Sequence, residues 1–158
     1  MVTAPVVAIA SQLAGESVQV SCERNARFSD ASRAYTVWQA NDGTIVFDPV
    51  IHLSASTCNE LNRLVVRDTR SSAGQTQFVT NGGAIIDLAG GGAVHLLLHE
   101  ALHLREKSTD EARVECDASR NAWSAVALFH LAAWRDQQIL RGMAVAHAGS
   151  APSYLKDC

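Results

Sequence analysis

The sequence of 158 residues lacks the features that mark several large classes of protein. It has no basic patch or arginine-rich run, so a nucleic-acid-binding protein is not expected. No apolar run approaches the roughly 20 residues that span a bilayer, which argues against a membrane-spanning helix. None of its 4 cysteines forms a Cys-x-x-Cys pair, so a cysteine-ligated zinc finger is not expected. Its glycine runs lack the Gly-Lys-Ser/Thr ending of a phosphate-binding loop.

The composition is that of a soluble globular protein with few charges. Hydrophobic residues make up 47% and charged residues 18% of the chain, and the net charge is -3. The length suits one domain, residues 1–158, and we find no internal repeat or linker that would divide it. The first residues are small and apolar but have no basic stretch before them, so we interpret them as a strand-forming lead-in and not as a signal peptide.

The first third of the chain shows strand patterns. Alternation and β-branched residues predict strands at residues 6–10, 16–22, 35–40, 44–47 and 50–53. The sequence Asp42-Gly43 between two of these runs predicts a β-hairpin, and Asp48-Pro49 is expected to end it.

The rest of the chain is mainly helical in pattern. Helices are predicted from Ser56 or Thr57 to residue 67, over 93–105 and over 110–133, with residues 134–147 extending the last helix or forming another. Tight turns or close packing explain the glycines at 90–92. The predicted fold is α+β, mostly β in residues 1–53 and mostly α in residues 54–158. A helix carrying the site is followed by a long antiparallel C-terminal helix.

The four cysteines are widely spaced, at positions 22, 58, 116 and 158. An even number at scattered positions favours two disulfides in an oxidising compartment, although buried reduced thiols are the alternative. Of the three possible pairings we favour Cys22–Cys58 and Cys116–Cys158, because the second would anchor a loose C-terminal tail to a helix.

The most specific pattern is His99-Glu100-Ala-Leu-His103, an HExxH sequence inside an apolar helical stretch. Positions four apart lie on one face of a helix, so the two histidines can reach one metal ion, with Glu100 beside them to handle a proton. A buried pair of ionisable rings without a partner would be costly, so a metal is expected.

Acidic residues follow at a distance that suits a third metal ligand. If two helices form an antiparallel hairpin turning near Lys107, then His103 faces Glu111 and His99 faces Glu115. Asp110 is a rival ligand because it closely follows the motif. Glu111 has a second reading, as the last residue of a capping box that begins at Ser108.

These residues resemble the HExxH zincins, and Glu111-Ala-Arg-Val-Glu115 is similar to the ExxAD-type motif of gluzincin metallopeptidases. The resemblance implies that Glu111 is the third zinc ligand and that Glu115 orients His99. The chain departs from that motif at Val114 and in having Glu at 115, so the longer Glu115 could exchange roles with Glu111. The cysteine positions and the HExxH and acidic segments also resemble small exported actinobacterial proteins with an HExxH domain, which implies export.

The resemblance implies a zinc metallopeptidase in which Glu100 is the general base for water attacking a peptide carbonyl. Its partner would be a peptide or protein substrate. A second donor to the developing oxyanion is needed, and the candidates are Tyr154, Tyr35, Arg105 and His95.

Two other functions remain open in the sequence. One is a non-catalytic zinc-binding or disulfide-stabilised interaction domain, and a fourth ligand such as His95 would favour it. The other is a disulfide-bonded module in which the motif is a coincidence. We expect His95 to be a core or rim residue, and His52, His130 and His147 to be ordinary surface or core residues.

Overall fold

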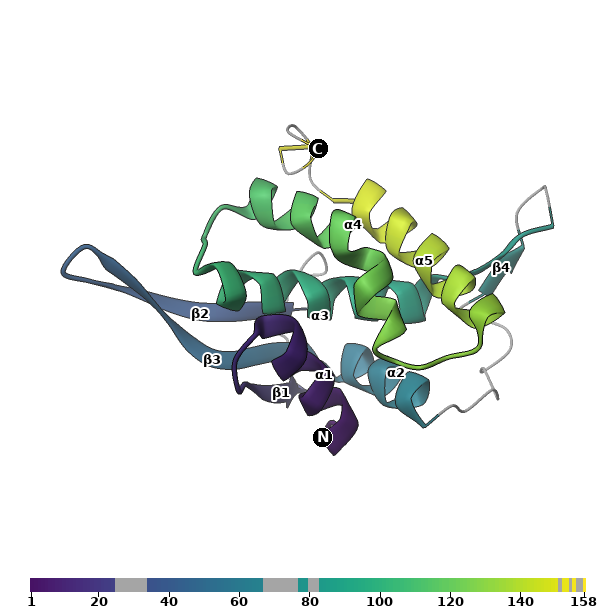
Figure 1. Ribbon diagram of the computed structural model, residues 1–158, viewed down its shortest axis with the longest axis horizontal. Coiled ribbons are helices and arrows are strands. Elements are labelled where there is room, and N and C mark those ends of the chain that lie inside the picture. The colour runs from purple at the N-terminus through teal and green to yellow at the C-terminus, as the bar shows by residue number, and fades with distance from the viewer. Residues whose placement is uncertain (25–33, 67–76, 80–82, 151, 154, 156–157) are drawn as a thin grey trace.

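A computed structural model describes residues 1–24, 34–66, 77–79, 83–150, 152–153, 155 and 158 (Figure 1). The predicted α+β class is confirmed: the described residues contain five helices and a mixed three-stranded sheet. The helices are α1 (Ala4–Ala14), α2 (Ala55–Val65), α3 (Leu88–Glu106), α4 (Glu111–Ala127) and α5 (Ala133–Ala148). The strands are β1 (Gln19–Glu23), β2 (Ala34–Asn41), β3 (Thr44–Ser54), β4 (Gln77–Val79) and β5 (Ile85–Asp87).

The larger sheet has the order β1-β3-β2, with β1 parallel and β2 antiparallel to β3. The predicted β2–β3 hairpin is confirmed, with Asp42 and Gly43 at φ 47° and 80°, and it projects beyond the helices (Figure 1). The predicted break at Pro49 is wrong, because β3 continues through it to Ser54. The pairing with β2 passes from Phe47 to Ile51, so proline lies where no ladder bond to β2 is lost.

The predicted strand at residues 6–10 is wrong, because these residues belong to helix α1. Pro5 lies in the first turn, where its missing N–H costs nothing, and Gly15 ends the helix at φ 71°. The side chains that this helix buries recur at helical spacing: Val6, Ile9, Ala10, Leu13 and Ala14.

Helix α3 lies at the centre of the molecule and contacts the four other helices and the sheet (Figure 1). It begins at Leu88, not near Ala93, because the buried Asp87 side chain caps it by accepting from the Gly90 N–H at 2.8 Å. The glycine run lies inside its first turns. A Cβ on Gly91 would lie 2.5 Å from the backbone of Gly142 in α5, so close helix packing explains this glycine.

The single helix predicted over residues 110–133 is also wrong. Helix α4 ends at Ala127 and α5 begins at Ala133, with His130 at φ 49° between them. Helix α2 is capped by Ser54, two residues before the predicted start, through its Oγ and the Thr57 N–H at 3.2 Å.

Both favoured disulfides are present. Cys22–Cys58 joins β1 to α2, and Cys116–Cys158 ties the C-terminal tail to α4. Two disulfides are typical of proteins from an oxidising compartment. Among the described helices, none has the length and apolar character needed to cross a membrane.

Candidate metal centre

One face of α3 carries the buried polar residues of the site. His99, Glu100 and His103 are only 8%, 6% and 4% exposed, although they are ionisable. Apolar neighbours such as Leu97, Leu98 and Leu102 hold the helix in the core. The spacing of four residues places the two imidazoles one turn apart on this face, with ring centroids 4.8 Å apart.

The turn at Lys107 brings acidic residues of α4 opposite these histidines. Lys107 has φ 49°, and beyond it α4 runs back beside α3 (Figure 1). Glu111 Oε2 lies 3.0 Å from His99 Nε2 and 3.4 Å from His103 Nε2. Glu115 Oε2 lies 2.9 Å from His99 Nδ1. These are the facing pairs that a turn at Lys107 predicts, with Glu111 near both rings.

The ring nitrogens that face Glu111 both carry lone pairs when the rings are neutral. His103 Nδ1 lies 2.7 Å from the carbonyl oxygen of Ser108, which can only accept a hydrogen bond. His99 Nδ1 likewise faces the Glu115 carboxylate, so we assign the proton of each neutral ring to Nδ1. The two Nε2 atoms nevertheless lie 3.1 Å apart, beside a carboxylate oxygen. Three acceptors that converge in this way require a cation or extra protons between them.

The spacing of these three acceptors fits a tetrahedral metal ion. Zinc–ligand bonds of about 2.0–2.1 Å place neighbouring ligand atoms of a tetrahedron roughly 3.3–3.4 Å apart. The three separations here are 3.0, 3.1 and 3.4 Å. His99, His103 and Glu111 therefore form a group that could hold a metal, with two nitrogens and one oxygen as ligands.

The close approach of the two imidazoles and the Glu111 carboxylate shifts the pKa values of all three groups. Burial disfavours the His99 imidazolium, but hydrogen bonds to Glu111 and Glu115 outweigh it and raise the pKa of His99 to about 9. Burial opposes protonation of His103 as well, and its hydrogen bonds to Glu111 and the Ser108 carbonyl raise its pKa. Hydrogen bonds from His103 and His99 lower the pKa of Glu111 to about 2.

Glu100 lies beside this group in a different environment. Burial raises the pKa of its carboxyl group, and the nearby His99 and His103 and a hydrogen bond with the Thr36 side chain only partly oppose this. These residues line one cavity of about 600 Å³ between α3, the start of β2, the start of α4 and the end of α5. The cavity walls include Tyr35, Trp38 and Leu96.

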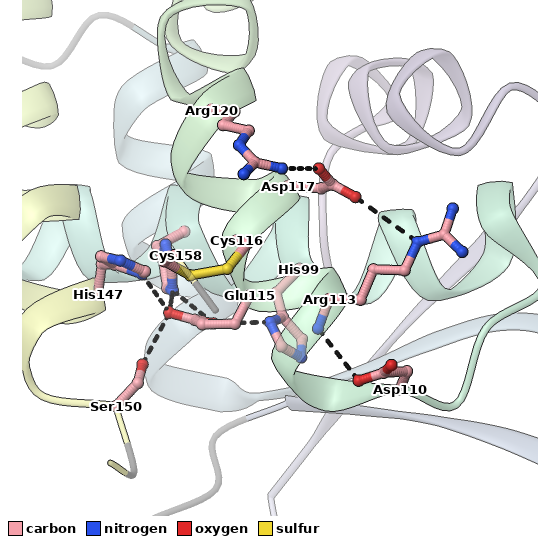
Figure 2. The surroundings of a disulfide bond; sticks show 11 residues. His99, Asp110, Arg113, Glu115, Cys116, Asp117, Arg120, His147, Ser150 and Cys158 are labelled. Atoms are coloured by element: carbon pink, nitrogen blue, oxygen red, sulfur yellow. Dashed lines mark hydrogen bonds and ion pairs between the residues drawn. A yellow bond between two sulfur atoms is a disulfide. The ribbon is translucent and has the colours of Figure 1, made fainter. Parts of the chain in front are cut away.

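Glu115 lies 2% exposed behind His99, on the side away from Glu111. Its carboxylate contacts His95. It also contacts three donors that Figure 2 labels: His99, His147 and the Ser150 hydroxyl. Hydrogen bonds from His95 and His99 outweigh the cost of its burial and lower its pKa. Its oxygen bonds the His99 nitrogen that does not face Glu111, which is the contact that orients a ligand ring.

The contacts of the C-terminal residues differ from the expectation. His147 is not an ordinary surface residue, because its Nδ1 lies 2.8 Å from Glu115 Oε1. No pattern in the sequence predicts a role for Ser150. Neither residue belongs to a motif, and only the need of a buried carboxylate for partners could have prompted a search for them.

Other candidates take different places. Asp110 caps α4, accepting from the Arg113 N–H at 3.1 Å, so a capping box from Ser108 to Glu111 is not formed (Figure 2). His95 bonds Glu115 at 3.0 Å and is not part of the group formed by His99, His103 and Glu111.

Of the candidate oxyanion donors, Tyr35 and His95 line the cavity, and Tyr154 lies outside the described residues. Arg105 pairs with Glu106 at 3.7 Å and is not among the described residues that line the cavity. The Tyr35 hydroxyl donates to Glu23 Oε1 at 2.9 Å.

Comparison of the chain with protein-family models, with curated proteins and with solved structures found no match.

Proposed function

We propose that this chain is a zinc-dependent metallopeptidase that hydrolyses peptide bonds. The observation that carries the proposal is the convergence of three lone-pair donors, from His99, His103 and Glu111, beside a buried Glu100 on the wall of a cavity. Two nitrogens and one carboxylate oxygen are a ligand set of catalytic zinc sites, which leave a position for water or substrate.

A bound zinc ion would lower the pKa of a water molecule and polarise the substrate carbonyl. Glu100 takes the proton of the attacking water on a carboxylate oxygen and delivers it to the nitrogen of the leaving amine. The raised pKa of its buried carboxyl group suits this role, because a stronger base accepts the proton more readily. Glu115 and the Ser108 carbonyl hold the two imidazole rings so that each Nε2 keeps its lone pair for the metal.

The cavity and the chemistry of the site support a peptide or protein as the substrate. The cavity opens beside the edge strand β2 and is large enough for part of a peptide. The two disulfides support an extracytoplasmic location, where the substrate would be a peptide or protein met outside the reducing cytoplasm.

The test compares the wild type with Glu100→Gln, using Asp42→Asn, an exposed acid-to-amide change in the β2–β3 turn, as a surface control. Protein purified without chelator is analysed for metal and incubated with a peptide library, and new termini are identified by mass spectrometry. We expect one zinc per chain in all three proteins, and cleavage that is lost at least 100-fold only in Glu100→Gln. Zinc without cleavage in the wild type would replace this proposal with a non-catalytic zinc-binding domain. Absence of zinc from the wild type would contradict both functions.

A further inference from the structure

The Glu115 carboxylate is surrounded by donors from three parts of the chain. Its Oε1 lies 3.0 Å from His95 Nε2, 2.8 Å from His147 Nδ1 and 2.8 Å from Ser150 Oγ. Its Oε2 lies 2.9 Å from His99 Nδ1. His95 and His99 come from α3. His147 comes from the last turn of α5 and Ser150 from the chain just beyond it (Figure 2).

His95, Glu115 and His147 also have the composition of a second metal site. Their hydrogen-bonding pattern argues against that assignment. Each imidazole can present one N–H to the carboxylate and the serine presents its O–H, so donors meet an acceptor in every contact. The group around Glu111 is the opposite case, because two ring nitrogens without protons face each other there. The set around Glu115 is therefore complete as a hydrogen-bond network.

This network fixes the carboxylate from the side opposite His99. A carboxylate held only by one ring could rotate about its side-chain bonds, and the ring would rotate with it. The contacts on Oε1 remove that freedom, and all are buried or partly buried. Helix α5 is itself held in place, because Gly142 packs against the backbone of Asp87 in β5 and of Gly91 in α3. The disulfide Cys116–Cys158 secures the tail beyond Ser150 to the residue next to Glu115 (Figure 2).

We propose that His147 and Ser150 are positioning residues for the metal ligand His99, acting through Glu115. The inference rests on the proposed zinc site and adds the C-terminal end of α5 to it. Neither residue has a ligand atom in the group of His99, His103 and Glu111, so their effect passes through the shared carboxylate. Replacing residues that orient a ligand typically weakens metal binding by about 10–100-fold.

The experiment measures zinc affinity by competition with a chromogenic chelator. Ser150→Ala and His147→Ala are compared with the wild type. Ser124→Ala and Val145→Ala, both exposed on α4 and α5, serve as matched controls. We expect zinc affinity to fall roughly tenfold in each of the two network variants. The controls and the conservative variant Ser150→Thr, which keeps the hydroxyl, should bind zinc as the wild type does.

Two further readouts separate positioning from a general loss of structure. The metal-free variants should melt close to the metal-free wild type. The visible absorption of the cobalt-substituted protein, which reports ligand geometry, should change in Ser150→Ala and return in Ser150→Thr.

Each contrary outcome has a distinct meaning. Wild-type zinc affinity and an unchanged cobalt spectrum in Ser150→Ala and His147→Ala would overturn the positioning role and leave the proposed function standing. Two zinc ions per wild-type chain, with one lost in His147→Ala, would replace the network with a second metal site. A wild type that binds no zinc would overturn the positioning role and the peptidase proposal together.

Discussion

In the metal-free protein, His99 is the residue whose protonation we expect to make stability depend on pH. It faces the carboxyl groups of Glu100, Glu111 and Glu115 and the ring of His103, so its imidazolium gains several partners on folding. Without a metal ion, protonation of the imidazoles supplies the positive charge between the converging acceptors.

We predict that chelator-treated protein loses stability as the pH rises from about 6.5 to about 9. The pKa of His99 is raised from 6.5 to about 9, so its contribution is complete below pH 6.5 and lost as the pH passes the folded value. The pKa of Glu111 is lowered from 4.5 to about 2, so its contribution is present above pH 4.5 and lost on acidification towards 2. These two groups together favour the folded state most between pH 4.5 and 6.5.

Urea unfolding at half-unit pH intervals measures this dependence. In Glu111→Gln the decline above pH 6.5 should be shallower, because the neutral side chain no longer stabilises the His99 imidazolium. A free energy of unfolding that increases between pH 6.5 and 9 would contradict the assignment.

Much of the site can be predicted from residues close together in the sequence. The spacing of His99 and His103 and the turn at Lys107 are local features, and a helix hairpin converts them into facing pairs with Glu111 and Glu115. His147 and Ser150 could not be predicted in the same way. Their contact with Glu115 depends on how α5 packs across α3. No local sequence pattern predicts the relative placement of two helices.

At the scale of the elements, the incorrect predictions concern the type of one element, α1, and the points at which β3, α3 and α4 begin or end. The small apolar residues of α1 suit a strand or a helix, and the burial period of the helix is clear only when residues 6–14 are read together. The break between α4 and α5 contains neither glycine nor proline, so no local signal predicts it. Phe129, which lies in the break, is buried in the core. The hairpin was predictable because Asp42-Gly43 specifies its turn directly.

The crossing of α3 and α5 depends on glycine, so we predict that Gly142→Ala strongly destabilises the protein. The added methyl carbon would lie 2.0 Å from the Asp87 carbonyl oxygen, and backbone cannot yield as a flexible side chain can. We expect the free energy of unfolding to fall by about 1–3 kcal/mol, which is typical of overpacked cores.

Gly92→Ala is the matched control within α3. A Cβ at Gly92 meets no described atom within 4 Å, so helix propensity should make this variant up to about 1 kcal/mol more stable. Thermal and urea unfolding of both variants measure the difference. Equal stability of the two variants would show that the helices separate freely at their crossing.

At the scale of the whole molecule, the proposed metal site would link metal binding to folding through α3 and α4. The three candidate ligands come from these two helices, and the unfolded chain does not hold them together. We predict that free zinc at 1,000 times its dissociation constant stabilises the fold by about 4 kcal/mol. For a chain of this size, that corresponds to a rise in Tm on the order of 10 °C.

Calorimetry of the wild type with zinc and with chelator measures this shift, and His103→Ala is the control. The variant lacks one of the three ligands, so zinc should raise its Tm far less. An equal rise in the wild type and in His103→Ala would place the bound zinc elsewhere in the molecule.

The two disulfides also bear on the order in which the protein matures. Thiolates bind zinc tightly, and a reduced chain carries four cysteines, one of them adjacent to Glu115. After oxidation all four are paired, so the nitrogen and oxygen donors around His99 face no competing thiolate. At the proposed site, a chain that is oxidised before it meets zinc would bind the ion through its imidazoles and carboxylate. A chain that meets zinc before oxidation would offer it thiolate ligands instead, and a cysteine that binds zinc would not be free to form its disulfide.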